Sequence, residues 1–256
     1  MYRVVVPARY DSARLPGKPL LPLLGRPMIE WVYERARRSA AREVIIATDD
    51  ARIVQAAEAF GAKVLLTAAT HSSGTDRIGE VARRLHWAAA DIVVNVQGDE
   101  PLMPPALIDQ VAALLQAHAD AAMATLATPI ESAAALLDPN VVKVVTDLRQ
   151  RALYFSRAPI PWAREGASAG LLSQNNCAMA RRHLGIYAYR VGALTRLSAT
   201  PPSALERLEQ LEQLRALEHG MEIRVADALV AAGADVNTAA DVAAVEALLA
   251  QDRQRA

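Results

Sequence analysis

Short runs of β-branched and aliphatic residues alternate along the first half of the chain with stretches of helical periodicity. The apolar runs predict strands over residues 3–6, 43–47, 63–66 and 91–96. Helices are predicted between them over residues 27–39, 51–60 and 76–85. Strands that are apolar on both faces and are separated by single helices favour parallel βαβ units, with helices on both faces of the sheet.

The alternation becomes less regular in the second half. Residues 141–145 and 152–155 are predicted to form an antiparallel hairpin, because their connection is too short for a crossover helix. Residues 157–182 are rich in Pro, Gly, Ser and Asn and predict a long loop, a length that favours a functional role. The other predicted elements are helices over 105–119, 205–218 and 238–250 and strands over 122–127, 184–189 and 223–226.

These elements predict one α/β domain over residues 1–256, in which a mostly parallel, Rossmann-like sheet is flanked by helices. We expect a core of residues 1–128 and 196–256, interrupted by a small antiparallel excursion over residues 129–195.

Composition narrows the class of protein. With 52% hydrophobic and 22% charged residues, the chain is globular rather than disordered. Its 28 basic and 28 acidic residues balance, so no overall basic field attracts nucleic acid or an anionic membrane. The single cysteine, Cys177, excludes an internal disulfide and a cysteine metal cluster. No secretory leader or membrane span is predicted, and we expect a cytoplasmic protein.

Three cations gather in the loop after the first predicted strand. Arg9, Arg14 and Lys18 lie in a segment that also holds Gly17 and two prolines. Ligands of open α/β sheets bind at the carboxyl ends of the strands, and such a loop can offer guanidinium and backbone N–H groups to phosphates. The alternative is a basic surface turn. The segment is not a Walker A loop, because the required glycine spacing and Lys-Ser/Thr pair are missing.

A pair of carboxylates follows the strand predicted over residues 91–96. Gln97, Gly98, Asp99 and Glu100 lie at its carboxyl end, where Gly98 allows a ligand to approach the backbone closely. Mg²⁺ in proteins takes one or two carboxylates together with phosphate oxygens and water. The segment therefore predicts a magnesium site beside the cationic loop, the alternative being a polar turn before the next helix.

Two further groups carry less specific signals. Ser73, Gly74 and Thr75 precede a helix, and their hydroxyl and backbone groups suit either a nucleotide base or an ordinary helix N-cap. Arg157, His183 and Tyr187 lie in or beside the expected excursion and suit an anionic, hydroxylated substrate. For His183 alone, a hydrogen-bonded histidine at a strand edge is an equal alternative.

Seven blocks of sequence, in this order, resemble one known family. They are PARYDSARLPGKPL (7–20), ATDD (47–50), HSSGTDR (71–77), VNVQGDEP (94–101), YFSRAPIPW (154–162), RHLGIYAYR (182–190) and ERLEQLEQLR (206–215). The chain resembles the 3-deoxy-manno-octulosonate (Kdo) cytidylyltransferases, or CMP-Kdo synthetases, from about residue 3 to residue 248. In the related sialic acid cytidylyltransferases, glycine and serine replace the RLPGK segment of the first loop.

This resemblance implies a fold of the nucleotide-diphosphosugar transferase type, whose excursion binds the sugar and forms a homodimer. It implies that CTP and Kdo react to CMP-Kdo and pyrophosphate with Mg²⁺, for lipopolysaccharide synthesis. Arg9, Arg14, Lys18 and Asp99 are the implied catalytic residues. The implied nucleotide contacts are Pro7, Ala8, Arg9, Arg14, Lys18, Ser73, Gly74, Thr75, Arg77 and Gln97. The implied contacts of the sugar acid are Gln97, Arg157, Arg164, His183, Tyr187, Glu212 and Gln213.

The chain departs from the family pattern at the second implied metal ligand. Where the family has aspartate to partner the equivalent of Asp99, this chain has Asn237. An asparagine carbonyl can bind a hard cation but brings no negative charge, and Asp235 lies two residues earlier, on the same side of an extended segment. Three readings stay open: an active CMP-Kdo synthetase, a cytidylyltransferase for a modified sugar acid such as an amino-Kdo, and a catalytically weak nucleotide-binding homologue.

Overall fold

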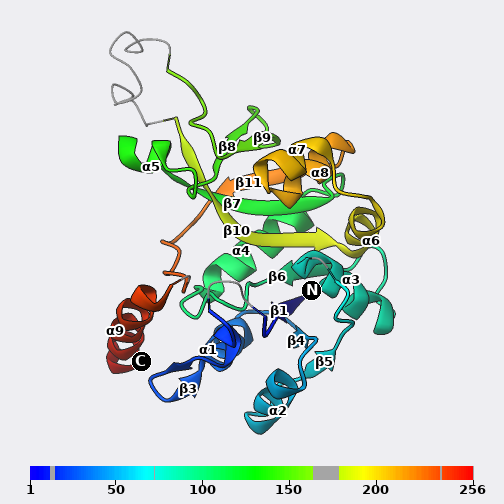
Figure 1. The fold of residues 1–256 in the computed structure, drawn as a ribbon. Coiled ribbons are helices and arrows are strands. Elements are labelled where there is room, and N and C mark those ends of the chain that lie inside the picture. Colours follow the sequence, from blue (N-terminus) through cyan, green and yellow to red (C-terminus); the bar gives the residue numbers. More distant parts are fainter. Residues whose placement is uncertain (12–14, 72, 164–178, 237, 256) are drawn as a thin grey trace.

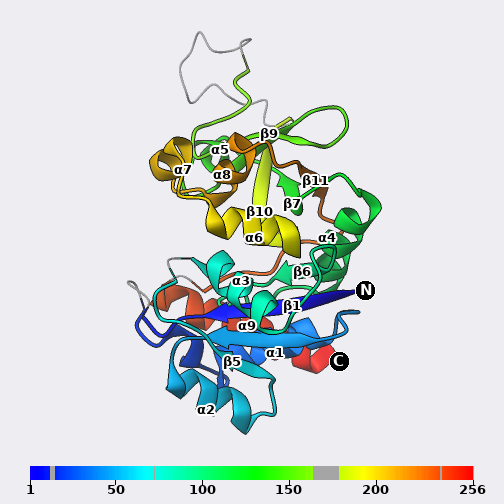
Figure 2. The ribbon, with the colours of Figure 1, turned by 90° about the vertical axis from the view of Figure 1, so that its right-hand side faces the viewer.

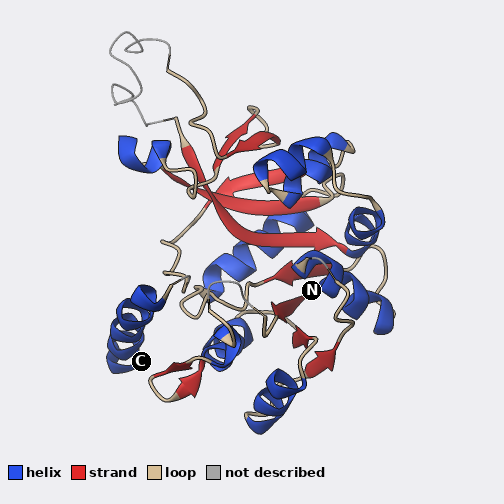
Figure 3. Cartoon of the chain, viewed as in Figure 1, coloured by secondary structure: helices blue, strands red, loops and turns tan. Residues whose placement is uncertain are grey.

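A mixed sheet runs through the molecule, with helices on both of its faces (Figure 1). The computed structural model describes residues 1–11, 15–71, 73–163, 179–236 and 238–255. Within them, the strand order along the sheet is β11-β7-β10-β6-β1-β4-β5, and β8 and β9 branch off beside β10. Figure 3 separates these strands from the helices by colour.

The first half of the chain builds the parallel part of the sheet. Its main elements are β1 (Tyr2–Ala8), α1 (Met28–Arg37), β4 (Val44–Thr48), α2 (Ala51–Ala59), β5 (Val64–Leu66), α3 (Gly74–Arg84), β6 (Ile92–Asn95), α4 (Pro105–Ala117) and β7 (Met123–Pro129). β1 pairs in parallel with both β4 and β6, and β4 pairs in parallel with β5. The predicted mostly parallel, helix-flanked sheet is confirmed, with ends shifted by a few residues.

The second half adds antiparallel strands. Its elements are α5 (Ala133–Leu137), β8 (Lys143–Thr146), β9 (Ala152–Ser156), β10 (Arg181–Arg190), α6 (Val191–Ala199), α7 (Ala204–Glu209), α8 (Glu212–Glu218), β11 (Ile223–Asp227) and α9 (Ala239–Arg255). The predicted hairpin is confirmed, because β8 and β9 pair antiparallel. β10 lies between β6 and β7 and is antiparallel to both. The part of the expected excursion from residue 181 onward therefore belongs to the central sheet.

One predicted helix is wrong, because residues 205–218 form two helices, α7 and α8. Gln210 between them has φ 54°, a left-handed conformation that ends a right-handed helix. Leucines of this segment differ in burial as well, since Leu208 is 80% exposed whereas Leu211 and Leu214 are buried. Ser203 and Glu206 form a capping box at the start of α7.

Short elements were also missing from the sequence prediction. They are the 3₁₀ turn η1 (Lys18–Leu20), the small hairpin of β2 (Pro22–Leu23) and β3 (Arg26–Pro27), and the helices α5 and α6. The β2–β3 turn places both Leu24 and Gly25 at positive φ. Leucine rarely adopts that conformation, so the residue gives no signal of this turn.

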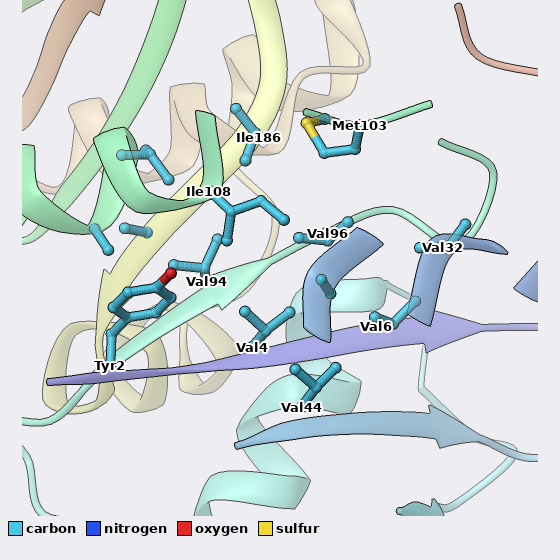
Figure 4. Packing of buried hydrophobic residues seen from close by; sticks show 14 of the residues in the cluster. Tyr2, Val4, Val6, Val32, Val44, Val94, Val96, Met103, Ile108 and Ile186 are labelled. Carbon is cyan, nitrogen blue, oxygen red and sulfur yellow. The ribbon is translucent and has the colours of Figure 1, made fainter. Parts of the chain in front are cut away.

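Alternating residues of β1 divide the core into two layers. Val4 and Val6 pack on one face, with α1 and α4, whereas Val5 packs on the other, with α3, α6 and α8. Figure 4 shows the first layer from close by. In Figure 2, α7 and α8 lie at one end of the molecule and α1 and α9 at the other. None of the described helices is both long and apolar enough to cross a bilayer.

A third, smaller cluster attaches the C-terminal helix. Val245 and Leu249 of α9 pack with Leu23 of the small hairpin and with Met28 and Trp31 of α1. The Leu24 N–H donates to Glu246 Oε1 at 2.7 Å. The last helix thereby supports the segment that leads from the cationic loop into α1.

Candidate functional site

Two cavities adjoin at the carboxyl ends of β1 and β6. The first has a volume of about 260 Å³ and the second about 280 Å³. Gly74 and Gln97 line both, so the two cavities share a wall. This is the sheet edge at which the sequence predicts ligand binding.

The first cavity is formed by the loop after β1 and the turn after β6. Its lining residues are Pro7, Ala8, Arg9, Asp11, Lys18, Pro19, Gly74, Gln97, Gly98 and Asp99. Lys18 Nζ donates to Asp99 Oδ2 at 2.6 Å, and the two side chains are 12% and 34% exposed. The predicted phosphate-binding lysine and the predicted metal-binding carboxylate thus form an ion pair with each other.

Two glycines allow this close approach of the loop and the turn. A Cβ on Gly98 would lie 2.9 Å from the backbone oxygen of Pro7, closer than real contacts allow. Gly17 has φ 72°, and its N–H donates to Tyr10 O at 2.9 Å, which closes the cationic loop. Both positions therefore favour glycine for reasons that can be read from the backbone.

Negative charge accumulates behind Asp99. Burial, followed by the charges of Asp99 and Asp235, raises the pKa of Glu100 to about 8. The Val236 N–H donates to Asp99 O at 3.0 Å, which holds the segment before α9 against this turn. Within the described part of the chain, no three His, Cys, Asp or Glu side chains are grouped as a metal site. Asp99 alone, with phosphate oxygens and water, matches the way proteins commonly bind Mg²⁺.

The second cavity lies between the sheet and helices α3, α6 and α8. Its lining residues are Gly74, Thr75, Asn95, Gln97, Met123, Val142, His183, Gly185, Tyr187, Tyr189, Leu197, Leu211, Glu212 and Gln213. None of these described lining residues is a lysine or an arginine. The cavity therefore presents hydrogen-bonding groups and one carboxylate, Glu212, whose Oε1 lies 3.1 Å from Arg215 Nη2 behind the lining.

A hydrogen bond connects two residues that the sequence assigned to different ligands. Thr75 Oγ1 donates to Glu212 Oε2 at 2.5 Å. Burial raises the pKa of Glu212, and the hydrogen bonds from Thr75 and Ser73 act in the opposite direction. A residue implied for the nucleotide and one implied for the sugar acid are thus in direct contact.

His183 is neutral in this structure. Burial, followed by the charge of Arg182, lowers the pKa of His183 to about 3. Its Nε2 lies 3.1 Å from Thr125 Oγ1, and the same hydroxyl lies 2.7 Å from the acceptor Ile186 O. Because a threonine hydroxyl has a single proton to donate, His183 Nε2 is the donor to Thr125. Its other ring nitrogen, Nδ1, therefore carries a lone pair.

Three of the predicted contact residues have other partners. Ser73 is the N-cap of α3, and its Oγ accepts from Asp76 N at 3.1 Å. The side chain of Arg77 is fully buried and donates to Asp49 Oδ2 at 2.7 Å and to Thr67 Oγ1 at 2.5 Å. Arg157 donates to the carbonyls of Glu209 and Pro139 at 2.7 and 2.9 Å. None of the three lines either cavity.

Three further predicted residues, Arg14, Arg164 and Asn237, lie outside the described residues. The structure brings the other predicted residues together, namely Pro7, Ala8, Arg9, Lys18, Gly74, Thr75, Gln97, Asp99, His183, Tyr187, Glu212 and Gln213.

Sequence reasoning missed Asn95 and Tyr189 of the second cavity and Asp11 of the first. Asn95 offered a signal, since it is the one polar residue within the apolar strand sequence IVVNV at 92–96. Tyr189 offered none, because alternation along a strand does not tell an aromatic core residue from one that lines a cavity.

Comparison with known proteins places the chain among nucleotidyl-transferring proteins. A family model described as cytidylyltransferase matches residues 3–223. The chain is 57% identical over 248 residues to a 3-deoxy-manno-octulosonate cytidylyltransferase of Pseudomonas fluorescens, covering 97% of this chain and 98% of that protein. Its identity to the protein of the same name from Thioalkalivibrio sulfidiphilus is 57% over 249 residues, with the same coverage.

Solved structures agree with this placement. A structure of CMP:2-keto-3-deoxy-manno-octonic acid synthetase complexed with CTP superposes with a TM-score of 0.88 at 44% identity, covering 98% of this chain and 99% of that one. A cytidylyltransferase from Leptospira borgpetersenii has a TM-score of 0.55 at 18% identity, covering 91% of this chain and 78% of that one, a likeness of fold alone.

Proposed function

The chain belongs to the 3-deoxy-manno-octulosonate cytidylyltransferase family, and we propose that it transfers CMP from CTP to the anomeric hydroxyl of Kdo. The products are CMP-Kdo and pyrophosphate, and the proposed role is in lipopolysaccharide synthesis in the cytoplasm. One observation carries the assignment of the two substrates. A cavity lined by Arg9 and Lys18 adjoins, through Gly74 and Gln97, a cavity lined by uncharged hydrogen-bonding groups and one carboxylate, Glu212.

In the proposed reaction, the anomeric oxygen of Kdo attacks the α-phosphorus of CTP. A new oxygen–phosphorus bond forms and the hydroxyl proton passes to water, while the bond from the α-phosphorus to the α,β-bridging oxygen breaks and pyrophosphate leaves with its electron pair. No covalent enzyme intermediate is needed. The protein aligns the two reactants across the shared wall, and such alignment supplies several kcal/mol of the catalytic effect.

In this proposal, Lys18 can pair either with Asp99 or with the phosphates of CTP. Its ammonium group lies 2.6 Å from Asp99 Oδ2 in the structure. A triphosphate in the first cavity brings more negative charge than one carboxylate, so we expect Lys18 to move from Asp99 to the phosphates. There it stabilises the charge that develops on the departing pyrophosphate, together with Arg9.

Mg²⁺ is the proposed cofactor, and Asp99 is the described residue that fits it. The side chain of Asp99 is 34% exposed at the first cavity, and its release by Lys18 leaves a carboxylate free for a hard cation. When bound, Mg²⁺ neutralises phosphate charge and lowers the pKa of a bound hydroxyl. Asn237 remains the proposed second ligand.

The experiment that tests the function is pyrophosphate release from CTP and Kdo with Mg²⁺, with Asn237→Asp and Mn²⁺ measured in parallel. We expect release by the unmodified protein. Release only by Asn237→Asp would mean that the metal site is attenuated, and release only with an amino-substituted Kdo would mean a different sugar acid. No release by either protein with CTP, UTP or several sugar acids would refute the transferase and favour a nucleotide-binding homologue.

We further propose that the protein is a homodimer that pairs through the β8–β9 hairpin. Among the described strands, β9 pairs with β8 alone in the sheet, so its outer edge is open. Leu148 and Leu153 of the hairpin are 106% and 61% exposed. Sedimentation equilibrium should give a dimer for the unmodified protein and a monomer for Leu153→Arg. A monomeric unmodified protein would refute this part of the proposal.

A further inference from the structure

Two residues in the lining of the second cavity each carry a buried polar atom without a partner in the described part of the chain. Among the described residues, Asn95 Oδ1 and Tyr187 Oη are buried and have no hydrogen-bond partner. Asn95 is 3% exposed and Tyr187 is 6% exposed. Both line the same cavity. Few buried polar groups in folded proteins lack a partner, so two such groups in the wall of one cavity require an explanation.

The fold places these two groups opposite each other. Asn95 ends β6, and its partner across the antiparallel pairing with β10 is Tyr187. Residues directly opposite on neighbouring strands project from the same face of the sheet, about 5 Å apart. That face is the one covered by α3, α6 and α8, since Val93, two residues before Asn95, packs in the same layer. The juxtaposition therefore follows from the register of two strands.

The neighbouring polar groups already have hydrogen-bond partners. Thr75 donates to Glu212, and the hydroxyl of Thr125 donates to Ile186 O and accepts from His183. Asn95 has a carbonyl oxygen left to accept. Tyr187 has a hydroxyl left to donate or accept.

The charges of the cavity define the ligand group that suits this pair. A carboxylate is disfavoured, because Glu212 lines the cavity, and the arginine beside it, Arg215, is outside the lining and already paired with Glu206 and Glu212. An apolar group would leave both atoms unpaired, at a cost of about 1–3 kcal/mol each. An alcohol satisfies both, because it donates to an amide oxygen and accepts from a phenol.

We propose that Asn95 and Tyr187 together bind one hydroxyl group of the sugar acid, and that Asn95 is a specificity-determining residue not assigned by sequence. This inference rests on the proposed function for the identity of the substrate. This contact orients the sugar acid. Its polyhydroxyl part enters the second cavity, and its carboxylate lies away from Asn95 and Tyr187. The Asn95 amide acts by direct contact with the substrate.

The test uses steady-state kinetics of pyrophosphate release with Tyr187→Phe, Asn95→Leu and Asn95→Asp. Loss of one hydrogen bond to a buried partner corresponds to about a ten-fold change. We expect Tyr187→Phe and Asn95→Leu to raise the KM for Kdo about ten-fold or more, with the KM for CTP within about two-fold. Asn95→Asp keeps an acceptor oxygen and should lose less than Asn95→Leu.

Ser198→Ala is the matched control. Ser198 Oγ is also buried without a partner among the described residues, but it lines a different cavity between α3 and α6. Its removal should leave both KM values unchanged. Thermal unfolding of each variant shows whether it is folded, and if Asn95→Leu does not fold, Tyr187→Phe and Asn95→Asp decide the question.

Deoxy analogues of Kdo identify the hydroxyl. Against the analogue that lacks the contacted group, the unmodified protein and Tyr187→Phe should have the same KM within about two-fold. Against the other analogues, the about ten-fold difference should persist. An unchanged KM for Kdo in folded Tyr187→Phe and Asn95→Asp, or an equal rise in the KM for CTP, would overturn the inference.

Calorimetry separates this inference from the proposed function. Kdo is titrated into protein saturated with a CTP analogue whose α,β-bridging oxygen is replaced by methylene, so that no transfer takes place. Weaker Kdo binding by Tyr187→Phe supports the inference even if the unmodified protein releases no pyrophosphate with CTP. Absence of Kdo binding by the unmodified protein refutes the inference, whatever the outcome of the transfer assay.

Discussion

The two adjoining cavities have similar volumes but opposite chemical character. The first, at about 260 Å³, is lined by charged side chains of both signs from the loop after β1 and the turn after β6. The second, at about 280 Å³, is lined by tyrosines, amides and a neutral histidine, with Glu212 as its only described carboxylate. Charged side chains are thus concentrated in the cavity that we propose for the triphosphate, and hydrogen-bonding groups with one carboxylate in the cavity that we propose for the sugar acid.

This difference fits the demands of the two substrates. Phosphates carry charge that changes during the reaction, and fixed cations stabilise that change. Hydroxyl groups carry no charge, and sites that bind them select through buried groups that are left unpaired when the hydroxyl is missing. The comparison predicts that substitutions in one cavity affect mainly one substrate.

The largest expected effect tests whether Arg77 belongs to the charged cavity at all. Arg77→Met removes a fully buried guanidinium from Asp49 and Thr67. Breaking a buried ion pair on one side costs about 3–5 kcal/mol, so the free energy of unfolding in urea should fall by that amount. Arg84→Met is the control, because the Arg84 side chain on the same helix is 47% exposed. It should change the free energy of unfolding by less than about 0.5 kcal/mol. An Arg77→Met protein of unchanged stability and raised KM for CTP would show that Arg77 contacts the nucleotide.

The next largest effect is expected for Lys18→Met, which removes a cation from the lining of the first cavity. Removing one group that stabilises developing charge costs about 10²–10³-fold in rate, so kcat/KM for CTP should fall by that factor. The KM for Kdo should stay within about two-fold, because Lys18 does not line the second cavity. Lys63→Met is the matched control, since Lys63 is 53% exposed and pairs with Glu43 away from both cavities. Equal losses for both substrates would contradict the division of roles.

The neutrality of the second cavity predicts a pH dependence of stability. The folded-state pKa of His183, about 3, lies below the ordinary value of 6.5. Between these values the unfolded chain binds a proton that the folded protein does not, so stability falls as the pH decreases from about 6.5 towards 3.

At pH 5 this contribution is about 2 kcal/mol relative to pH 7.5. His183→Gln should remove it, so the difference in unfolding free energy between the two pH values should shrink by about 2 kcal/mol. His219→Gln, at an exposed position, is the control. An identical pH dependence in His183→Gln and the unmodified protein would show that His183 is not held neutral.

The smallest expected effect concerns the support of the first cavity by the last helix. Glu246→Ala removes the acceptor of the Leu24 N–H, 2.7 Å away. We expect a loss of about 1 kcal/mol in unfolding free energy and a modest rise in the KM for CTP, because η1 and the cationic loop lie on the same segment. An unchanged KM for CTP together with a raised KM for Kdo would show that α9 does not support the first cavity.

The first cavity could be predicted from sequence because its parts are contiguous. Arg9 and Lys18 follow one strand, Gly98 and Asp99 follow another, and parallel strands bring such ends to one edge. What the sequence did not predict is their pairing. The contact between Lys18 and Asp99 depends on the approach of two loops, which only the backbone geometry around Gly98 fixes.

The second cavity was predicted in part, and through family resemblance more than through pattern. His183, Tyr187 and Glu212 were named from the sequence and line this cavity, whereas Asn95 was not named, because its position in the cavity depends on which residue of β10 lies opposite. The predicted ligand contacts of Arg77 and Arg157 stay predictions. Both lie in blocks shared with the family, yet their guanidinium groups in this structure are satisfied by Asp49 and Thr67 and by backbone carbonyls. A sequence block does not indicate which of its polar residues face inward.

The most direct test of the account is a crystal structure with CTP and a Kdo analogue that lacks the anomeric hydroxyl and therefore cannot react. The account predicts the triphosphate in the first cavity, with Lys18 moved from Asp99 to a phosphate, and a sugar hydroxyl between Asn95 and Tyr187 in the second. A sugar bound outside the second cavity, or a triphosphate that leaves the contact between Lys18 and Asp99 intact, would contradict it.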